Sequence, residues 1–192
     1  MRLYSLASNF WQLTLNVAQE LIRRGNPNSL FRSGFAYPSD EEMEENLRWS
    51  DLRIAEPTLF NFYHGIELSL KALLVAKGEP VVKVHKLSRL LELVTTQYDS
   101  QELADFYGTY ILTDRLPPIL KEFCSESGVT MDMYYQSLKY PTGTKAESFN
   151  HSALKGHELE GVKLFSQISE DLGQSRRIIE KFIESECRDV LS

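Results

Sequence analysis

The stretch from Asn61 to Leu93 constrains the fold more than any other part of the chain. Its first half places apolar side chains three and four residues apart, which is the spacing of one face of an α-helix. Gly78 and Pro80 end this pattern, as a left-handed cap followed by a helix breaker would. A basic link carrying His85 then leads into a second amphipathic segment. The residues of the first apolar face, which we expect in the core, are Phe62, Ile66, Leu70 and Leu73 or Leu74.

The rest of the chain shows helical periods and no strand-like alternation. The predicted helices other than the one ending near Gly78 cover about residues 6–24, 39–51, 86–98, 100–116 and 151 or 154 to 188. These periods predict an all-α, up-and-down bundle of four to five main helices. A chain of 192 residues is expected to form a single domain, 1–192.

Local signals refine this prediction. Ser39 precedes Glu42 at the spacing of a capping box, and Pro57 suits the first turn of the helix that follows. Long loops are predicted near 25–38 and 125–149, where Gly, Pro, Asn and hydroxyl side chains interrupt the helical period. The inner face predicted for the first helix consists of Phe10, Leu13, Val17 and Leu21.

The helix and link described first resemble the HEPN domain family, named for higher eukaryotes and prokaryotes nucleotide-binding. In that family a helix reading roughly E-L-x-L-K-A-L-L runs through a Gly turn to a His before the next helix. The matching residues here are Glu67, Leu68, Leu70, Lys71, Ala72, Leu73, Leu74, Gly78, His85 and Leu87. The resemblance covers about residues 5–98. It implies a nucleotide- or RNA-related function, which must be argued separately from the fold.

RNA-cleaving members of this family carry an Arg followed, after four to six residues, by a His that serves in acid–base transfer. None of the four histidines here has an Arg at that spacing. The nearest approximation is Lys145 before His151, and a lysine cannot make the planar, two-pronged phosphate contact of a guanidinium. The pair Lys145 and His151 is therefore the only catalytic candidate, and the alternative interpretation is a loop lysine beside a histidine at a helix start.

Other residues are candidates for binding. Tyr63 and His64 lie one helical turn before Glu67 and Lys71, which predicts a polar cluster or an intrahelical ion pair. Basic side chains gather around the link, and Lys139 with Tyr140 lies in a segment similar to a basic–Tyr–Pro turn of HEPN-like proteins. The phosphate-binding candidates are Lys83, Lys86, Arg89, Lys139 and Tyr140; ordinary solvated side chains are the alternative.

Composition limits the partners. The net charge of −6 gives no global basic field, so an RNA-binding surface would have to be local. Cys124 and Cys187 are solitary, which suits the cytosol and argues against a zinc knuckle. His151 and His157 lack the same-face spacing of a helical zinc pair. We expect no metal, no cofactor, no signal peptide and no membrane span.

Two functional hypotheses follow. The first is a non-catalytic HEPN-like module that binds nucleotide, RNA or a partner, in a toxin–antitoxin, defence or nucleotidyltransferase-associated system. The nucleotidyltransferase or antitoxin would then be a separate polypeptide. The second is a divergent, metal-independent endoribonuclease that uses Lys145 and His151. A homodimer is expected from the family habit and from surplus apolar positions in the last helix, namely Leu164, Ile178 and Val190.

Overall fold

The computed structural model describes residues 2–26, 39–139, 149–155 and 159–189. Every regular element in these ranges is a helix, which confirms the all-α class. The helices are α1 (Arg2–Arg24), α2 (Asp40–Arg48), α3 (Asp51–Ala76), α4 (Leu87–Gln97), α5 (Gln101–Ile111), α6 (Pro118–Ser127), α7 (Met131–Lys139), the 3-10 helix η1 (His151–Leu154) and α8 (Leu159–Asp189).

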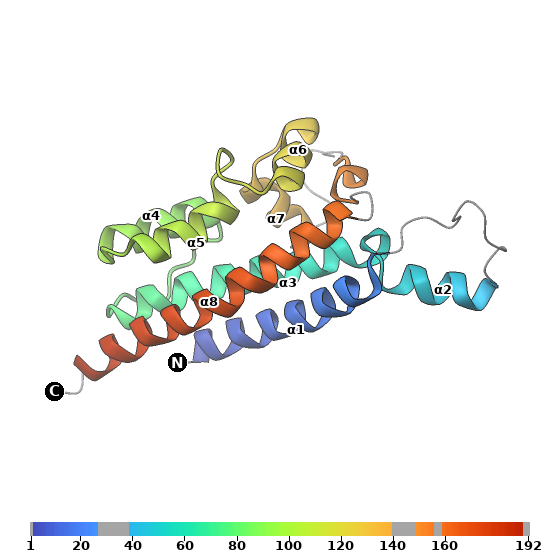
Figure 1. Ribbon diagram of the computed structural model, residues 1–192. Coiled ribbons are helices and arrows are strands. Elements are labelled where there is room, and N and C mark those ends of the chain that lie inside the picture. Colours follow the sequence, from blue (N-terminus) through green and yellow to red (C-terminus); the bar gives the residue numbers. More distant parts are fainter. Residues whose placement is uncertain (1, 27–38, 140–148, 156–158, 190–192) are drawn as a thin grey trace.

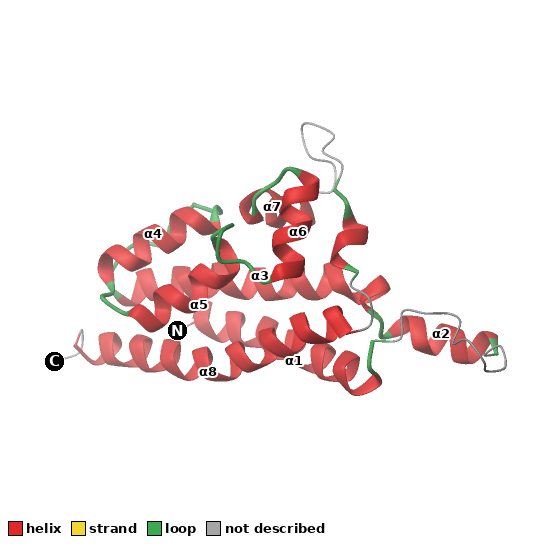
Figure 2. Cartoon of the chain, turned by 45° about the horizontal axis from the view of Figure 1, so that its top comes forward, coloured by secondary structure: helices red, strands yellow, loops and turns green. Residues whose placement is uncertain are grey.

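The three longest helices form an elongated layer, in which α1 runs antiparallel to both α3 and α8 (Figure 1). Helices α4 and α5 lie side by side over one end of this layer. Helices α6 and α7 lie next to them toward the other end, and α2 projects beyond it (Figure 2). The chain thus forms a long bundle in which α4, α5, α6 and α7 cover one side of α3.

Helix α3 is buried along most of its length, as the apolar spacing predicted. Leu70, Leu73 and Leu74 are at most 1% exposed, which confirms them as core residues. The helix begins earlier than predicted, at Asp51, so Pro57 lies inside it rather than in its first turn. The early start is stabilised by Asn26, whose side-chain oxygen accepts a hydrogen bond from the Asp51 backbone N–H at 2.9 Å.

Leu21 is buried as predicted, but the rest of the predicted inner face of α1 is rotated from the observed one. The residues it buries are Ala7, Trp11, Thr14, Ala18 and Leu21. Trp11 fills the core position because its indole N–H donates to the Phe62 carbonyl, 3.2 Å away. Gly65 lets the ring approach, since a Cβ there would collide with the indole. Leu13, predicted to face the core, is 47% exposed, and Leu6 is 43% exposed.

The stretch 125–149 was predicted as a loop, but it contains α7 and the end of α6. Pro118 occupies the first turn of α6, where a missing N–H costs nothing. Gly128 ends α6 in the left-handed conformation with φ +64. Both helices are short, ten and nine residues, so their apolar period is hard to detect from sequence. The other predicted loop, near 25–38, lies almost entirely outside the described residues.

Two of the three apolar residues on which the dimer prediction was based pack against the core of the same chain. Leu164 is only 3% exposed and belongs to the core, so it offers nothing to a second copy. Ile178 is half-buried against the same core, and Val190 lies outside the described residues. Among the exposed large apolar residues, Leu6 and Leu13 lie on α1, and Leu159 lies at the start of α8.

Candidate functional site

The most unusual side chain of the molecule is a buried carboxylate in the middle of α3. The Glu67 side chain is only 3% exposed. A buried ionised carboxylate is costly unless it is paired and hydrogen-bonded. Hydrogen-bond donors or positive charges are therefore expected around Glu67.

Both oxygens of Glu67 are occupied. Oε1 accepts from Nζ of Lys71 and from Nδ1 of His85, each at 2.8 Å. Oε2 accepts from the hydroxyl of Tyr135 and from Nζ of Lys139, each at 2.5 Å. Four donors from α3, the α3–α4 link and α7 thus converge on one carboxylate. We name these five residues, together with His64, the Glu67 cluster.

Helix α7 closes this cluster with one polar face. Residues 132, 135, 136 and 139 have the spacing of a single helical side. Besides the two donors to Glu67, the Gln136 side chain donates to the His85 carbonyl at 3.0 Å. The Asp132 carboxylate accepts from the backbone N–H of Ser88 at 3.1 Å. The link before α4 is therefore held between α3 and α7.

The hydrogen bonds fix the proton positions on both histidines. A carboxylate only accepts, so Nδ1 of His85 must carry the hydrogen that bonds Glu67. The single hydroxyl hydrogen of Tyr135 goes to Glu67, so Nδ1 of His64, 2.8 Å from that hydroxyl oxygen, must be the donor there. In the neutral form of each imidazole, Nε2 is left as an acceptor. Neither Nε2 has a hydrogen-bond partner among the described residues.

The charges in the cluster influence each other. Burial raises the pKa of Glu67, but hydrogen bonds from Lys139, Lys71, Tyr135 and His85 outweigh it and lower this pKa to about 2. Glu67 is therefore ionised at neutral pH. The pKa of His64 is lowered, mainly by burial; the charge of Glu67 opposes this, and the charges of Lys139 and Lys71 add to it. This direction favours the neutral, hydrogen-bond-accepting form of His64.

Aromatic rings surround part of the cluster. The His64 ring stacks on Phe60 with centroids 5.6 Å apart and meets Phe10 edge-on at 4.6 Å. The Lys139 ammonium lies 4.0 Å from the centroid of the Tyr135 ring. Tyr63, which was considered as a cluster member, points elsewhere: its buried hydroxyl donates to the Tyr110 carbonyl at 3.0 Å.

The outer edge of the cluster is basic. The side chain of His85 is 59% exposed, while those of Lys139 and Lys71 are 13% and 8% exposed. Lys83 and Lys86 flank His85 in sequence and are exposed, with no ion pair among the described residues. Arg89 is exposed too but pairs with Glu92 at 2.6 Å. Of the basic candidates around the link, Lys83 and Lys86 are thus free to meet a ligand.

The structure places His151 far along α3 from this cluster. His151 lies in η1, with Nδ1 3.5 Å from Oε1 of Glu56, and its ring packs near Phe123, Tyr134 and Phe149. Lys155 reaches the same Glu56 oxygen at 3.4 Å. No described contact joins His151 to the Glu67 cluster. Lys145 and Tyr140, the other candidates of that region, lie outside the described residues.

Tyr135 is the cluster member that sequence reasoning missed. It reaches Glu67 from 68 positions away, and only folding brings the two together. The available signal was the polar face of residues 132, 135, 136 and 139, which stands out once α7 is recognised as a helix. Lys139 was identified as a ligand-binding candidate, and the structure shows it bound to Glu67.

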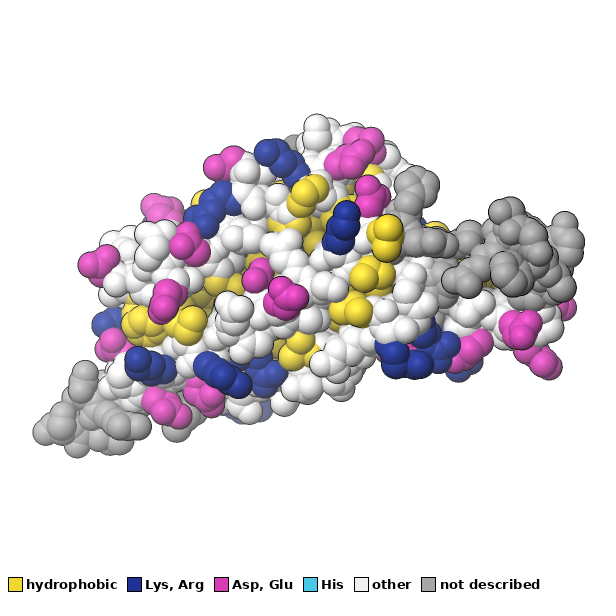
Figure 3. Space-filling view, viewed as in Figure 1, with side chains coloured by type: hydrophobic (Ala, Val, Ile, Leu, Met, Phe, Trp, Pro, Cys, Tyr) yellow, Lys and Arg dark blue, Asp and Glu magenta, His cyan; other side chains and the backbone are white. Residues whose placement is uncertain are grey.

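One face of the molecule shows little charge segregation. In Figure 3, Lys and Arg side chains are interspersed with Asp and Glu, hydrophobic side chains show between them, and no histidine is visible. Within the described ranges, no helix is long and apolar enough to cross a membrane. The same ranges hold no group of three or more His, Cys, Asp or Glu side chains arranged to bind a metal ion.

The fold is a helical bundle with a hydrogen-bonded ionic cluster on α3. The family model of the HEPN domain matches residues 41–184, which is most of the chain. The chain belongs to the HEPN domain family. No curated protein and no solved structure matches it significantly. Family membership indicates a nucleotide- or RNA-related function.

Proposed function

We propose that this protein is a non-catalytic binding module that takes a phosphate-bearing ribonucleotide, as free nucleotide or within RNA, at the outer edge of the Glu67 cluster. The observation that supports this is the convergence of two ammonium groups, the His85 imidazole and the Tyr135 hydroxyl on one buried carboxylate, with the His64 imidazole bonded to that hydroxyl. One negative charge stands against the two positive charges of Lys71 and Lys139. The surplus is positive, in a chain whose net charge is −6.

The positive surplus suits a phosphate. Glu67 holds the Lys139 ammonium in place through one of its three hydrogens. Lys83 and Lys86 add exposed charges beside His85. Preorganised ammonium groups attract phosphate without the entropic cost of ordering two free lysines. These side chains would neutralise phosphate, whereas Glu67 would only position them.

The histidines favour a ligand that also donates hydrogen bonds. In their neutral forms, Nε2 of His64 and of His85 can only accept. A ribose hydroxyl next to a phosphate offers such a donor, and the 2′-hydroxyl distinguishes RNA from DNA. The Phe60 ring, which stacks on His64, adds an apolar surface beside this acceptor.

Of the two functional hypotheses, the composition of the cluster favours a binding module over a ribonuclease. Among the described residues, no arginine takes part in its hydrogen bonds, so none of them places a guanidinium there to stabilise charge on a reacting phosphate. Its histidines are fixed as donors through Nδ1. A separate nucleotidyltransferase or antitoxin polypeptide is the partner that we propose for such a module.

Fluorescence anisotropy with labelled single-stranded RNA in EDTA tests the proposal. We expect the Lys83→Gln/Lys86→Gln double variant to bind RNA about tenfold more weakly at low salt. The slope of log affinity against log salt concentration should also decrease, by about the value of two phosphate contacts. His85→Ala should weaken RNA binding more than binding to DNA of the same sequence. Lys121→Gln, an exposed lysine on α6, is the control and should bind as the wild type does. Unchanged binding by the double variant would disprove the proposal.

We further propose that two copies associate through α1. Leu6, Phe10, Leu13 and Val17 follow one another at helical spacing, and Leu6 and Leu13 are exposed. The Phe10 ring contacts His64, so a second copy on this stripe would lie beside the Glu67 cluster. Sedimentation should show a dimer at tens of micromolar that Leu13→Glu dissociates. Val81→Glu, at another exposed apolar residue, should stay dimeric. A monomeric wild type would contradict this.

A further inference from the structure

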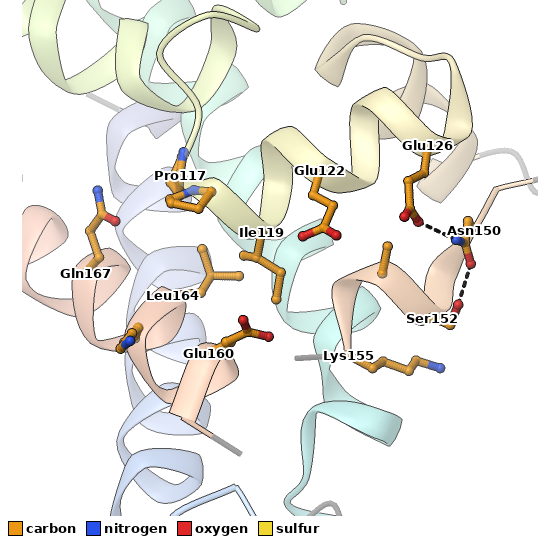
Figure 4. A pocket seen from close by; sticks show the side chains of 13 residues that line it. Pro117, Ile119, Glu122, Glu126, Asn150, Ser152, Lys155, Glu160, Leu164 and Gln167 are labelled. Atoms are coloured by element: carbon orange, nitrogen blue, oxygen red, sulfur yellow. Dashed lines mark hydrogen bonds between the residues drawn. The ribbon is translucent and has the colours of Figure 1, made fainter. Parts of the chain in front are cut away.

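A pocket of about 630 Å³ opens between α6, η1 and the first turns of α8, apart from the Glu67 cluster. Its lining combines apolar and charged side chains from these three elements (Figure 4). The volume is within the range of small-molecule sites. None of the residues proposed above for nucleotide binding lines it.

The floor of this pocket is apolar. Ile119 of α6 and Leu164 of α8 face each other across it and are 9% and 3% exposed. Ala153 of η1 and Pro117 extend the apolar surface. A ligand that lay here would therefore bury an aliphatic part against Ile119 and Leu164.

Two glutamates stand on either side of this floor. Figure 4 shows the carboxylates of Glu122 and Glu160 flanking the Ile119 side chain. Neither carboxylate has a hydrogen bond or an ion pair among the described residues. Of the other charged groups, Glu126 accepts from the Asn150 side chain at 2.6 Å and Lys155 pairs with Glu56, whereas Lys163 has no ion pair among the described residues. The unpaired charges of the pocket are thus the two carboxylates of Glu122 and Glu160 and the single ammonium of Lys163, which leaves a negative surplus.

The balance of charge selects a cation over an anion. Three glutamates and two lysines line the pocket, and Lys155 is already paired with a further glutamate. The start of α6 also lies at the pocket, but Pro117 and Pro118 carry no N–H to offer an anion. A bare metal ion does not fit either, because the floor between the carboxylates supplies no oxygen, nitrogen or sulfur ligand.

We propose that this pocket binds a guanidinium or primary ammonium group on an aliphatic stem. The cationic head is held between Glu122 and Glu160, and the stem lies on Ile119 and Leu164. Such a group exists in free diamines and polyamines and in the arginine side chain of a partner protein. The head supplies the charge that the two carboxylates lack, and the stem covers the apolar floor.

Isothermal titration at low salt with the full chain tests the site. The probes are agmatine, a guanidinium on a four-carbon stem; guanidinium chloride, which has no stem; and N-acetyl-arginine methylamide, which presents the same head from a peptide. We expect both stemmed probes to bind at least about tenfold more tightly than guanidinium, because only they bury methylene groups. Tighter binding of agmatine assigns the site to free amines, and tighter binding of the arginine derivative assigns it to a protein partner.

The variants separate the pocket from general surface charge. Glu122→Gln/Glu160→Gln should lose about tenfold or more in agmatine affinity, while Glu170→Gln, an exposed acid elsewhere on α8, should not. Glu122 and Glu160 are exposed, and thermal unfolding will show that the variant keeps the fold. Equal binding of agmatine and guanidinium, equal loss in both variants, or no loss in either would overturn the proposal.

Discussion

Two glutamates on α3, three helical turns apart, meet histidine and lysine in very different ways. Glu67 is buried and accepts four hydrogen bonds of 2.5 to 2.8 Å. Glu56 is 24% exposed, and its oxygen is 3.5 Å from Nδ1 of His151 and 3.4 Å from Nζ of Lys155. The same residue types thus form a tight cluster at one place and a loose group at the other.

The difference shows what fixes a polar group in a helical bundle. Around Glu67, a second helix, α7, supplies donors along one whole face. Around Glu56, the charged partners come from a four-residue 3-10 helix and the residue after it, and the buried Nδ1 of His151 has no hydrogen-bond partner among the described residues. Preorganisation, on which binding depends, is therefore expected at Glu67 and not at Glu56.

The largest expected effect is on stability at the tight cluster. Glu67→Ala should lower the free energy of unfolding by about 3–5 kcal/mol, because two largely buried ammonium groups lose their counter-charge. Urea unfolding followed by circular dichroism measures this. A cost below about 1 kcal/mol would mean that the cluster is solvated and no tighter than the group around Glu56.

A somewhat smaller effect is expected from acid. The pKa of Glu67 is lowered to about 2 in the folded protein, whereas the unfolded carboxyl titrates near 4.5. The unfolded chain therefore binds the proton first, and the stability that Glu67 contributes is present above about pH 5 and lost as the pH falls toward 2. The loss amounts to about 3 kcal/mol.

Comparison with Glu67→Gln isolates this contribution to the pH dependence. Glu20, Glu44 and Asp105 also have lowered pKa values, from hydrogen bonds with arginines, but they are present in both proteins. Chemical unfolding at a series of pH values should give a flatter acid limb for Glu67→Gln. Parallel curves for the two proteins would contradict a strongly paired Glu67.

A small effect is expected at the loose group. Glu56→Gln should change the free energy of unfolding by no more than about 1 kcal/mol, because its partners are at 3.4 and 3.5 Å and partly exposed. Urea unfolding followed by circular dichroism measures this change, and the Glu67→Gln variant provides the value for a tightly hydrogen-bonded carboxylate. A loss as large as that of Glu67→Gln would show that the two groups are equivalent.

No effect is expected from His151→Ala in a test for RNA cleavage. We expect no metal-independent cleavage above background from the wild type, since no arginine stands at the family spacing from a histidine. Mixed single-stranded RNA incubated in EDTA and resolved on a gel measures this. Cleavage that His151→Ala abolishes and His85→Ala leaves intact would instead favour the ribonuclease interpretation.

Local sequence patterns predicted the half of the Glu67 cluster that lies on α3. Glu67 and Lys71 are four residues apart, so their ion pair follows from helix geometry. Tyr135 and Lys139 could not be placed, because their contacts with Glu67 span about 70 residues and depend on α7. That helix was missed because it is nine residues long in a stretch rich in turn formers.

The prediction for α1 shows a second limit. Phe10, Leu13 and Val17 have the apolar spacing of a core face, yet the buried face consists of Trp11, two alanines, Thr14 and Leu21. The apolar spacing identifies large apolar residues, whereas packing against α3 depends on how the shapes of the side chains fit together. Small residues at Ala7 and Ala18 allow close approach, and the larger side chains were left partly outside.

The Trp11 indole, which is hydrogen-bonded to the Phe62 carbonyl, can also serve as an intrinsic fluorescent probe. The chain has two tryptophans. Trp11 is fully buried between α1 and α3, and Trp49 lies near α2 beneath the Arg24 guanidinium. With Trp49 replaced by Phe, the remaining indole emission would shift to the red when α1 leaves α3. Fluorescence of this single ring would therefore follow the separation of the two helices without any attached dye.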